Sequence, residues 1–453
     1  MKNRFFLISL FILPLLAWAI PGSAQERPIA FTGATIYPIE QAPIENGVLL
    51  IEGGVITAVG DSKTRIPRNA LISDVSGKVI LPGLVDTHSH IGGGDGGDRS
   101  SATHPDVRVM DSFNPLSPSI KKALSGGITA ANVMPGSGLL MSGQTIYVKL
   151  RATTDVQDML LCSEEYPEVC GGLKMANGTN PIGSGNSPGT RAKSAALVRA
   201  LFVEAQDYQQ KIMAAQDEEN NMPARNLRLE TLIEVLEGKR TVHHHTHRHD
   251  DVLTAIRLAD EFGYDMVLQH VSEAYKVADE IAASGYPSSI ITLDSFGGKM
   301  EAKDFSNANG AALEQAGAAV GIHTDDYVTD SRLFLRSAAF AVREGMSREK
   351  ALEALTLANA KMMRIDNRVG SLKKGKDADL VILSGDPFSV YTHVEQTWIE
   401  GQKIWDRSNP EDKKIATGGY GVFRLNTHTH THEGGNSYEL ITYILTHHDK
   451  NRP

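Results

Sequence analysis

Apolar, strand-like runs alternate with amphipathic helical stretches through the middle of the chain, and this alternation constrains the fold more than any other feature. Parallel strands need long crossover connections, usually helices, so the alternation predicts parallel βαβ units. Eight such units predict an α/β fold, a (β/α)8 or TIM barrel, over residues 81–364. The eight predicted strands are Val79–Val85, Ile128–Val133, Thr145–Leu150, Gly172–Met175, Thr241–His245, Tyr264–Gln269, Ser289–Leu293 and Ala318–Ile322.

Two helices and one irregular connection can be placed inside this region. Asp251–Glu261 carries apolar residues at helical spacing, and Ser347–Met363 is predicted as a second helix. The connection between Val133 and Thr145 is too short for a full helix. The barrel is therefore expected to depart from a regular one at this point.

The two ends of the chain share a different sequence pattern, which predicts short strands separated by tight turns. Residues 28–80 include a predicted hairpin with Gly53 and Gly54 at its turn, and Ala378–Leu383 reads as a strand near the other end. These two blocks, residues 25–80 and 365–407, predict one small β-sandwich domain built from both chain ends.

The N-terminus reads as a signal peptide over residues 1–24. Met1–Arg4 is basic, Phe5–Ile20 is apolar, and Gly22–Ala24 supplies small residues for cleavage. A membrane anchor is the alternative, but a spanning helix needs roughly 20 apolar residues. We therefore expect a periplasmic or secreted protein without a stable membrane anchor.

Export bears on the two cysteines of the chain, Cys162 and Cys170. Disulfides persist in oxidising compartments, so their even number and close spacing favour a bridge over two free thiols. Residues 408–453 form a tail in which His428, His430 and His432 alternate with Thr. This tail is expected to be dispensable for the chemistry.

Histidines gather where the predicted strands end. His88 and His90 follow the first strand at an i, i+2 spacing, so both side chains point the same way. The same alternation places His243, His245 and His247 on one face of the fifth strand, with His244 outward. In a (β/α)8 barrel the active site lies at the C-terminal ends of the strands. The residues that collect there as candidate metal ligands are His88, His90, Lys174, His245, His270 and Asp325.

Each of these residues also has a structural interpretation. A histidine pair occurs by chance in loops, and Asp325 after a strand could cap a helix. Lys174 could pack its stem while its ammonium reaches solvent, and spacing alone favours that reading over a carboxylated lysine. The combination at the ends of five strands is what favours a metal site.

The chain resembles a known family at this point. Leu81–His90 is similar to the opening motif of the amidohydrolase superfamily, and Gly370–Val381 resembles its closing motif. His245–Arg248 and Thr324–Asp325 fit the fifth and eighth strands. The nearest resemblance within the superfamily is to the imidazolonepropionase-related group, which includes prolidase-like dipeptidases. The resemblance covers residues 28–406.

The resemblance implies roles for individual residues. His88 and His90 would bind the more buried metal, and His245 and His270 the second. Asp325 would contact the first metal and act as the catalytic proton shuttle. Lys174 matches the lysine that is carboxylated and bridges the metals in binuclear members, whereas imidazolonepropionase itself uses one metal. Imidazole and carboxylate ligands suit two divalent zinc ions, with manganese, iron or cobalt as alternatives.

These features predict a metal-dependent hydrolase that cleaves a C–N bond in a small molecule or short peptide. His247, Arg248 and His323 are candidate substrate-binding residues. Arg248 would pair with a free carboxylate, as in a dipeptide or N-acyl amino acid, or it could merely neutralise Asp250 or Asp251.

Two other functions stay open, a cyclic amidase that opens lactam rings and a non-catalytic periplasmic metal-binding protein. Asp325 distinguishes an enzyme from a metal-binding protein, because a storage site needs no proton shuttle beside the metal. The net charge of −9 shows no basic surplus, which argues against nucleic acid as a partner. The sequence leaves open a homo-oligomer.

Overall fold

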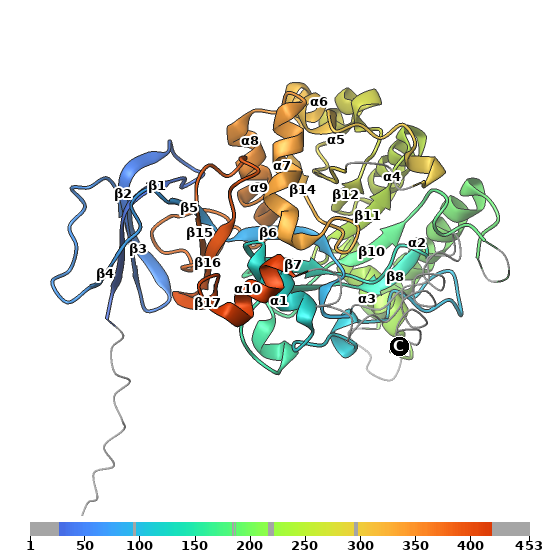
Figure 1. Ribbon diagram of the computed structural model, residues 1–453. Coiled ribbons are helices and arrows are strands. Elements are labelled where there is room, and N and C mark those ends of the chain that lie inside the picture. Colours follow the sequence, from blue (N-terminus) through green and yellow to red (C-terminus); the bar gives the residue numbers. More distant parts are fainter. Residues whose placement is uncertain are drawn as a thin grey trace, which may run out of the picture.

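The computed structural model describes most of the chain between residues 27 and 418 (Figure 1). The predicted signal peptide, residues 1–24, and the predicted tail beyond residue 418 lie outside the described residues. No helix in the described part is both long and apolar enough to cross a bilayer. The described ranges are 27–93, 97–183, 185, 187–215, 222–293 and 298–418.

An eight-stranded sheet, here named the composite sheet, lies at one end of the molecule (Figure 1). Its strands are β1 (Ile29–Ile36), β2 (Ile44–Glu52), β3 (Val55–Gly60), β4 (Leu71–Asp74), β5 (Val79–Pro82), β15 (Leu380–Leu383), β16 (Val394–Ile399) and β17 (Gln402–Asp406). The order is β17-β16-β15-β5-β1-β2-β3, and β4 pairs with β1. β5 and β15 are antiparallel neighbours, with Leu81 opposite Val381, so strands from both ends of the described chain meet.

The structure does not confirm the predicted two-layered β-sandwich. The strands of residues 25–80 and 365–407 join edge to edge in one sheet, because β15 completes the hydrogen bonds of β5. Phe31, Leu49, Ile80 and Leu380 belong to the apolar cluster that this sheet buries. Apolar alternation and turn residues specify strands, but they do not distinguish two stacked sheets from one joined sheet.

The strands that carry the candidate ligands form two further sheets. The strands are β6 (Leu84–Ser89), β7 (Ile128–Val133), β8 (Met141–Gln144), β9 (Ile146–Lys149), β10 (Leu173–Ala176), β11 (Val242–Thr246), β12 (Met266–His270), β13 (Ser288–Ile290) and β14 (Val320–Ile322). One sheet has the order β14-β13-β12-β11-β10-β8, and the other the order β6-β7-β9. β10 to β14 run parallel.

The strand pairing in the described residues therefore does not close into the regular (β/α)8 barrel that the sequence predicts. A bridge between Ser89 and Asp326 connects the two sheets on one side. On the other side the backbone N–H of Tyr147 donates to the carbonyl of Cys170, at 2.8 Å. The short connection after β7 explains the irregularity. A parallel crossover needs roughly a dozen residues or more, so the chain instead forms β8 and β9, which are antiparallel to β10 and β7.

Helices lie around these sheets, and most of them on the side away from the composite sheet (Figure 1). They are α1 (Pro118–Ser125), α2 (Arg191–Ala214), α3 (Leu227–Leu236), α4 (His249–Phe262), α5 (Ala278–Ser284), α6 (Asn309–Ala316), α7 (Phe334–Arg343), α8 (Arg348–Ala354), α9 (Leu357–Met362) and α10 (Pro410–Thr417). The predicted helix Asp251–Glu261 lies within α4, and Val252 and Ala255 are on its buried face. The predicted helix Ser347–Met363 is split into α8 and α9, because Thr356 adopts φ −137° and ψ −94°.

The predicted tail begins with an ordered helix. α10 packs against α1, and Arg332 donates to the carbonyl groups of Ile415 and Gly418 at 3.2 and 2.6 Å. The first residues after 408 therefore belong to the packed part of the protein. Cys162 and Cys170 are joined by a disulfide.

The predicted strand Val79–Val85 is two strands, β5 in the composite sheet and β6 beside β7. Gly83 separates them, and a Cβ at this position would lie 2.1 Å from Oγ1 of Thr129. A side chain at this position would therefore clash with the Thr129 side chain, and glycine avoids the clash. One short run thus connects the composite sheet directly to the strand that carries His88.

A buried charge network holds the composite sheet against β9. Lys149 is fully buried and contacts Asp377, with Asp379 at 3.1 Å and Glu400 at 3.2 Å from its Nζ. Arg151 donates to both carboxylate oxygens of Glu400, at 2.5 and 2.7 Å. These hydrogen bonds lower the pKa of Glu400 from 4.5 to about 2, although burial opposes the shift.

The lowered pKa of Glu400 predicts a pH-dependent stability. A carboxyl group whose pKa is lower in the folded protein stabilises the fold above its unfolded pKa and loses this effect as the pH falls through the folded value. We expect the Tm of the unmodified protein to fall between pH 4.5 and about 2 more steeply than that of Glu400→Gln. Thermal unfolding followed by circular dichroism measures both curves, and parallel curves would contradict the assignment.

Candidate metal centre

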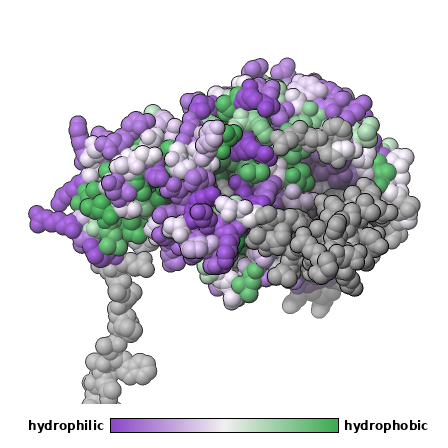
Figure 2. All heavy atoms as spheres, in the orientation of Figure 1, coloured by the Kyte–Doolittle hydropathy of each residue, from purple (hydrophilic) through white to green (hydrophobic). Residues whose placement is uncertain are grey.

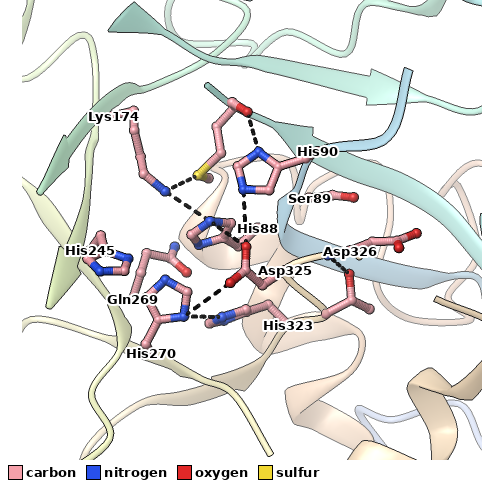
Figure 3. Close-up of polar contacts among 12 residues, drawn as sticks. His88, Ser89, His90, Lys174, His245, Gln269, His270, His323, Asp325 and Asp326 are labelled. Atoms are coloured by element: carbon pink, nitrogen blue, oxygen red, sulfur yellow. Dashed lines mark hydrogen bonds and ion pairs between the residues drawn. The ribbon is translucent and has the colours of Figure 1, made fainter. Parts of the chain in front are cut away.

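The six predicted ligands lie together at the ends of five strands (Figure 3). His88 is near the end of β6, Lys174 is in β10, and His270 ends β12. His90 follows β6, His245 is in β11, and Asp325 follows β14. The side chains of His88, Lys174 and His270 are at most 1% exposed.

The first cluster consists of His88, His90 and Asp325. Oδ1 of Asp325 lies 3.1 Å from Nε2 of His90 and 3.3 Å from Nε2 of His88. Nδ1 of His90 lies 2.7 Å from the carbonyl oxygen of Met134, to which it donates, so Nε2 is the nitrogen that faces Asp325. Two imidazoles and one carboxylate that converge in this way can hold a divalent metal ion.

Backbone contacts position Asp325 against β6. Its N–H donates to the carbonyl of His88 at 2.9 Å. The N–H and Oγ1 of Thr324 donate to the carboxylate of Asp86, at 3.1 and 2.5 Å. Asp325 and His270 both adopt a positive φ, of 50° and 71°. Non-glycine residues adopt this conformation at an energetic cost, which is typical of functional positions.

Lys174 lies between the two halves of the site. Its Nζ is 2.9 Å from Nε2 of His88 and 2.9 Å from the sulfur of Met134. The side chain is 0% exposed, so its ammonium does not reach solvent. This rules out the alternative in which Lys174 packs its stem and exposes its ammonium. Burial lowers the pKa of Lys174 to about 7. A large fraction of the amine is therefore neutral at neutral pH, and a neutral amine can take up CO2.

His245 and His270 present two nitrogen atoms that lack a partner. Nδ1 of His270 is 3.0 Å from Nε2 of His323, whereas Nε2 of His270 is buried without a hydrogen bond to any described residue. Nε2 of His245 is 3.0 Å from Nδ2 of Asn180, and Nδ1 of His245 is buried without a described partner. The centroids of the His245 and His270 rings are 4.4 Å apart. A buried polar atom without a partner costs free energy, so these nitrogens fit a metal that both would bind.

The charge state of the histidines also fits a metal. Burial lowers the pKa of His88, His245 and His270 well below 6.5. Neutral imidazole is the form that binds metals. Burial would raise the pKa of Asp325, but the hydrogen bond with His90 keeps it below its usual value, so this carboxylate is ionised at neutral pH.

The predicted substrate-binding residues are placed differently from one another. Nδ1 of His247 is 2.7 Å from Oγ of Ser272, and its ring stacks on His270. Arg248 forms two hydrogen bonds to Asp250, at 3.0 and 2.7 Å, at the start of α4. Its guanidinium therefore pairs with Asp250, which is the alternative to carboxylate binding that the sequence left open. It does not form part of the histidine cluster.

His323 is a buried support for His270. It is 0% exposed, with Nδ1 2.9 Å from Oγ of Ser289 and Nε2 against His270. Ser289 in turn lies 2.6 Å from Oγ1 of Thr87. Both nitrogens of His323 thus face groups of the protein, and its role toward a substrate stays a prediction.

This arrangement predicts a positioning role for His323. Replacing it with Phe should leave the fold intact and lower the affinity of the second metal position by about 10- to 100-fold, because partners that orient a ligand have effects of this size. Equilibrium dialysis against zinc measures the affinity. An unchanged affinity would show that His270 is held by its surroundings alone.

Sequence reasoning missed Lys299 and Glu301, which follow a run of small residues rather than a strand end. Nζ of Lys299 is 2.8 Å from Nε2 of His247 and 2.9 Å from Oε1 of Glu301. His245, His247 and Glu301 also converge as a further group of ligand-type atoms. The Lys299 ammonium occupies that group, so it holds a cation already. His244, expected to point outward from the strand, is 1% exposed.

The fold and site define an α/β protein with a buried centre for divalent metal at the carboxyl ends of its parallel strands. Comparison with known proteins agrees with this class. The model of the amidohydrolase family matches residues 79–405. The chain belongs to the amidohydrolase family, whose members are hydrolases acting on carbon–nitrogen bonds.

Individual relatives have different degrees of similarity. The structure of an amidohydrolase from Thermotoga maritima is 34% identical with a TM-score of 0.77, over 84% of this chain and 100% of that chain. Amidohydrolase tasK from Hapsidospora irregularis is 26% identical over 80% of this chain. The matched region covers only 40% of the length of tasK. A putative prolidase from Bifidobacterium longum shares the fold, at 18% identity and a TM-score of 0.53, over 84% of this chain and 95% of that chain.

Proposed function

We propose that this protein is a metal-dependent amidohydrolase that cleaves an amide bond of a dipeptide or N-acyl amino acid with a free carboxylate. The single observation that carries the proposal is the position of Asp325. An ionised carboxylate that contacts two imidazoles at 3.1 and 3.3 Å can both hold a cation and accept a proton.

The residues divide between two metal positions. His88, His90 and Asp325 would hold one divalent cation, and His245 and His270 would hold the second through their unpartnered nitrogens. Lys174, between them, would bridge both after carboxylation. Bound divalent cations supply Lewis-acid polarisation of a carbonyl group and lower the pKa of water.

Asp325 is the residue that would move the proton. Its carboxylate accepts a proton from the attacking water and returns it to the nitrogen of the leaving amine. The hydrogen bond of Nδ1 of His90 to Met134 leaves Nε2 as the nitrogen that would bind the metal, and a nitrogen that binds a metal would not be available to accept this proton.

The test combines metal analysis of the purified protein with a substrate screen. We expect about two equivalents of divalent metal, zinc first, and turnover of dipeptides or N-acyl amino acids. Turnover of lactams alone would replace this proposal with a cyclic amidase. Bound metal without turnover of any amide would replace it with a metal-binding protein.

We further propose that the protein is exported to the periplasm or secreted after removal of residues 1–24. The disulfide between Cys162 and Cys170 supports this compartment, because such bonds persist in oxidising surroundings. N-terminal sequencing of protein recovered from the periplasm tests the cleavage site. A mature chain that still begins at Met1 would contradict export by this route.

A further inference from the structure

Lys299 brings a primary ammonium to the edge of the histidine cluster. It precedes a short 3-10 helix, Met300–Ala302, in the connection between β13 and α6. Its Nζ lies 2.8 Å from Nε2 of His247 and 3.4 Å from Nε2 of His245. The side chain of Lys299 is 33% exposed, whereas that of Glu301 is 2% exposed. Lys299 therefore links the buried histidines to a surface that a ligand can reach.

The groups that surround this ammonium are themselves held in place. Ser272 fixes His247 through Nδ1, and the N–H of Thr179 donates to Glu301 at 2.6 Å. An ammonium has three N–H donors. Nε2 of His247 accepts one of them, Oε1 of Glu301 forms an ion pair with the ammonium at 2.9 Å, and Nε2 of His245 lies 3.4 Å away, which is long for a hydrogen bond. One donor of Lys299 thus remains poorly satisfied on the side of the proposed ligands.

Lys299 also takes the place that Arg248 was predicted to fill. Arg248 is bound through two hydrogen bonds to Asp250, outside the histidine cluster. The Nζ of Lys299 lies 3.4 Å from Nε2 of His245. It is therefore a partly exposed cation beside a proposed metal ligand, where the carboxylate end of a substrate would need its partner.

We propose that Lys299 binds the free carboxylate of the substrate and makes the enzyme select acids over their amides. The inference rests on the proposed amidohydrolase function and names the substrate group that the site would recognise. An ammonium acts as a compact point charge, so it suits a carboxylate that varies in orientation among substrates of different size. Glu301 holds the ammonium in position from the buried side.

A simpler role for Lys299 is to neutralise the buried carboxylate of Glu301. The two roles differ in what they predict for neutral ligands. A residue that only neutralises Glu301 affects acids and amides equally, whereas a carboxylate-binding residue affects acids alone.

The experiment uses Lys299→Met, which keeps the apolar stem and removes the charge. The double variant Lys299→Met/Glu301→Gln leaves no buried carboxylate unpaired. Lys303→Ala is the matched control, because Lys303 is an exposed lysine on the same segment. Isothermal titration calorimetry of the zinc-loaded proteins measures the affinity for N-acetyl-L-alanine and for its C-terminal amide, and metal content is determined for each variant.

Lys299→Met and the double variant should bind the acid about 10- to 100-fold more weakly, the range for a hydrogen bond to a charged group, with the amide unaffected. The control should match the unmodified protein. Equal losses for acid and amide, an unchanged acid affinity, or no preference of the unmodified protein for the acid would overturn the inference. All proteins in this titration also carry Asp325→Asn, which prevents turnover, so calorimetry measures binding alone and a failure of the proposed hydrolysis is recognised separately in the substrate screen.

Discussion

Replacing Asp325 with Asn is expected to lower kcat by about 10²- to 10⁴-fold while the fold and most of the bound metal remain. The amide keeps the size of the side chain and one oxygen that can face His88 and His90. It cannot accept the proton of the attacking water. Steady-state kinetics, metal analysis and thermal unfolding of the variant measure the three expectations.

The neighbouring carboxylate provides the control for this result. Asp326 is also buried, but its side chain forms an ion pair with Lys122 at 2.6 Å. Asp326→Asn should lower the Tm, because it removes the ion pair with the partly buried Lys122, and should retain the kcat of the folded fraction. Near-normal activity in Asp325→Asn, or an equal loss in both variants, would show that Asp325 is not the proton shuttle.

The second large effect is expected at Lys174. Lys174→Met fills the same buried volume and removes the amine, so the protein should fold and lose metal affinity by more than about 100-fold, since even residues that only orient ligands contribute up to that factor. Reconstitution of the unmodified apoprotein with zinc should require CO2. It should become faster as the pH rises through about 7, because the neutral amine is the form that reacts.

Lys174→Ala provides a complementary test. This variant leaves a cavity between the metal positions, and short-chain carboxylic acids should enter it and restore part of the activity, whereas Lys174→Met should not respond to them. High-resolution density that ends at an unmodified amine with both metals bound would rule out the carbamate.

The sequence was sufficient to locate the site because the ligands follow strands with strong apolar patterns. Lys174 and His245 lie inside predicted strands, and His270 and His88 follow predicted strands by one and three residues; strand ends converge in this fold. The resemblance to the amidohydrolase superfamily, which the family match confirms, assigned their roles.

Other features depend on contacts that no local pattern encodes. Arg248 lies between the histidines and two aspartates, and the sequence alone could not decide which neighbour it would bind. Lys299 and Glu301 reach the site from an irregular connection without periodicity. The spacing of His244 correctly places it opposite His243 and His245, but that face lines a cavity together with residues of α2 and α4. Figure 2 shows one face of the molecule in the orientation of Figure 1.

The pairing of β5 with β15 has a consequence for the order in which the protein can form. Nearly 300 residues separate Leu81 from its neighbour Val381, so this contact carries a large loop-closure cost and is expected to form late. During synthesis β5 and its neighbour β1 emerge early, yet β15, its other neighbour, emerges almost last. The composite sheet therefore cannot be completed until nearly the whole chain is available. Late completion of this sheet suits the proposed export, in which the chain would pass a membrane channel before folding.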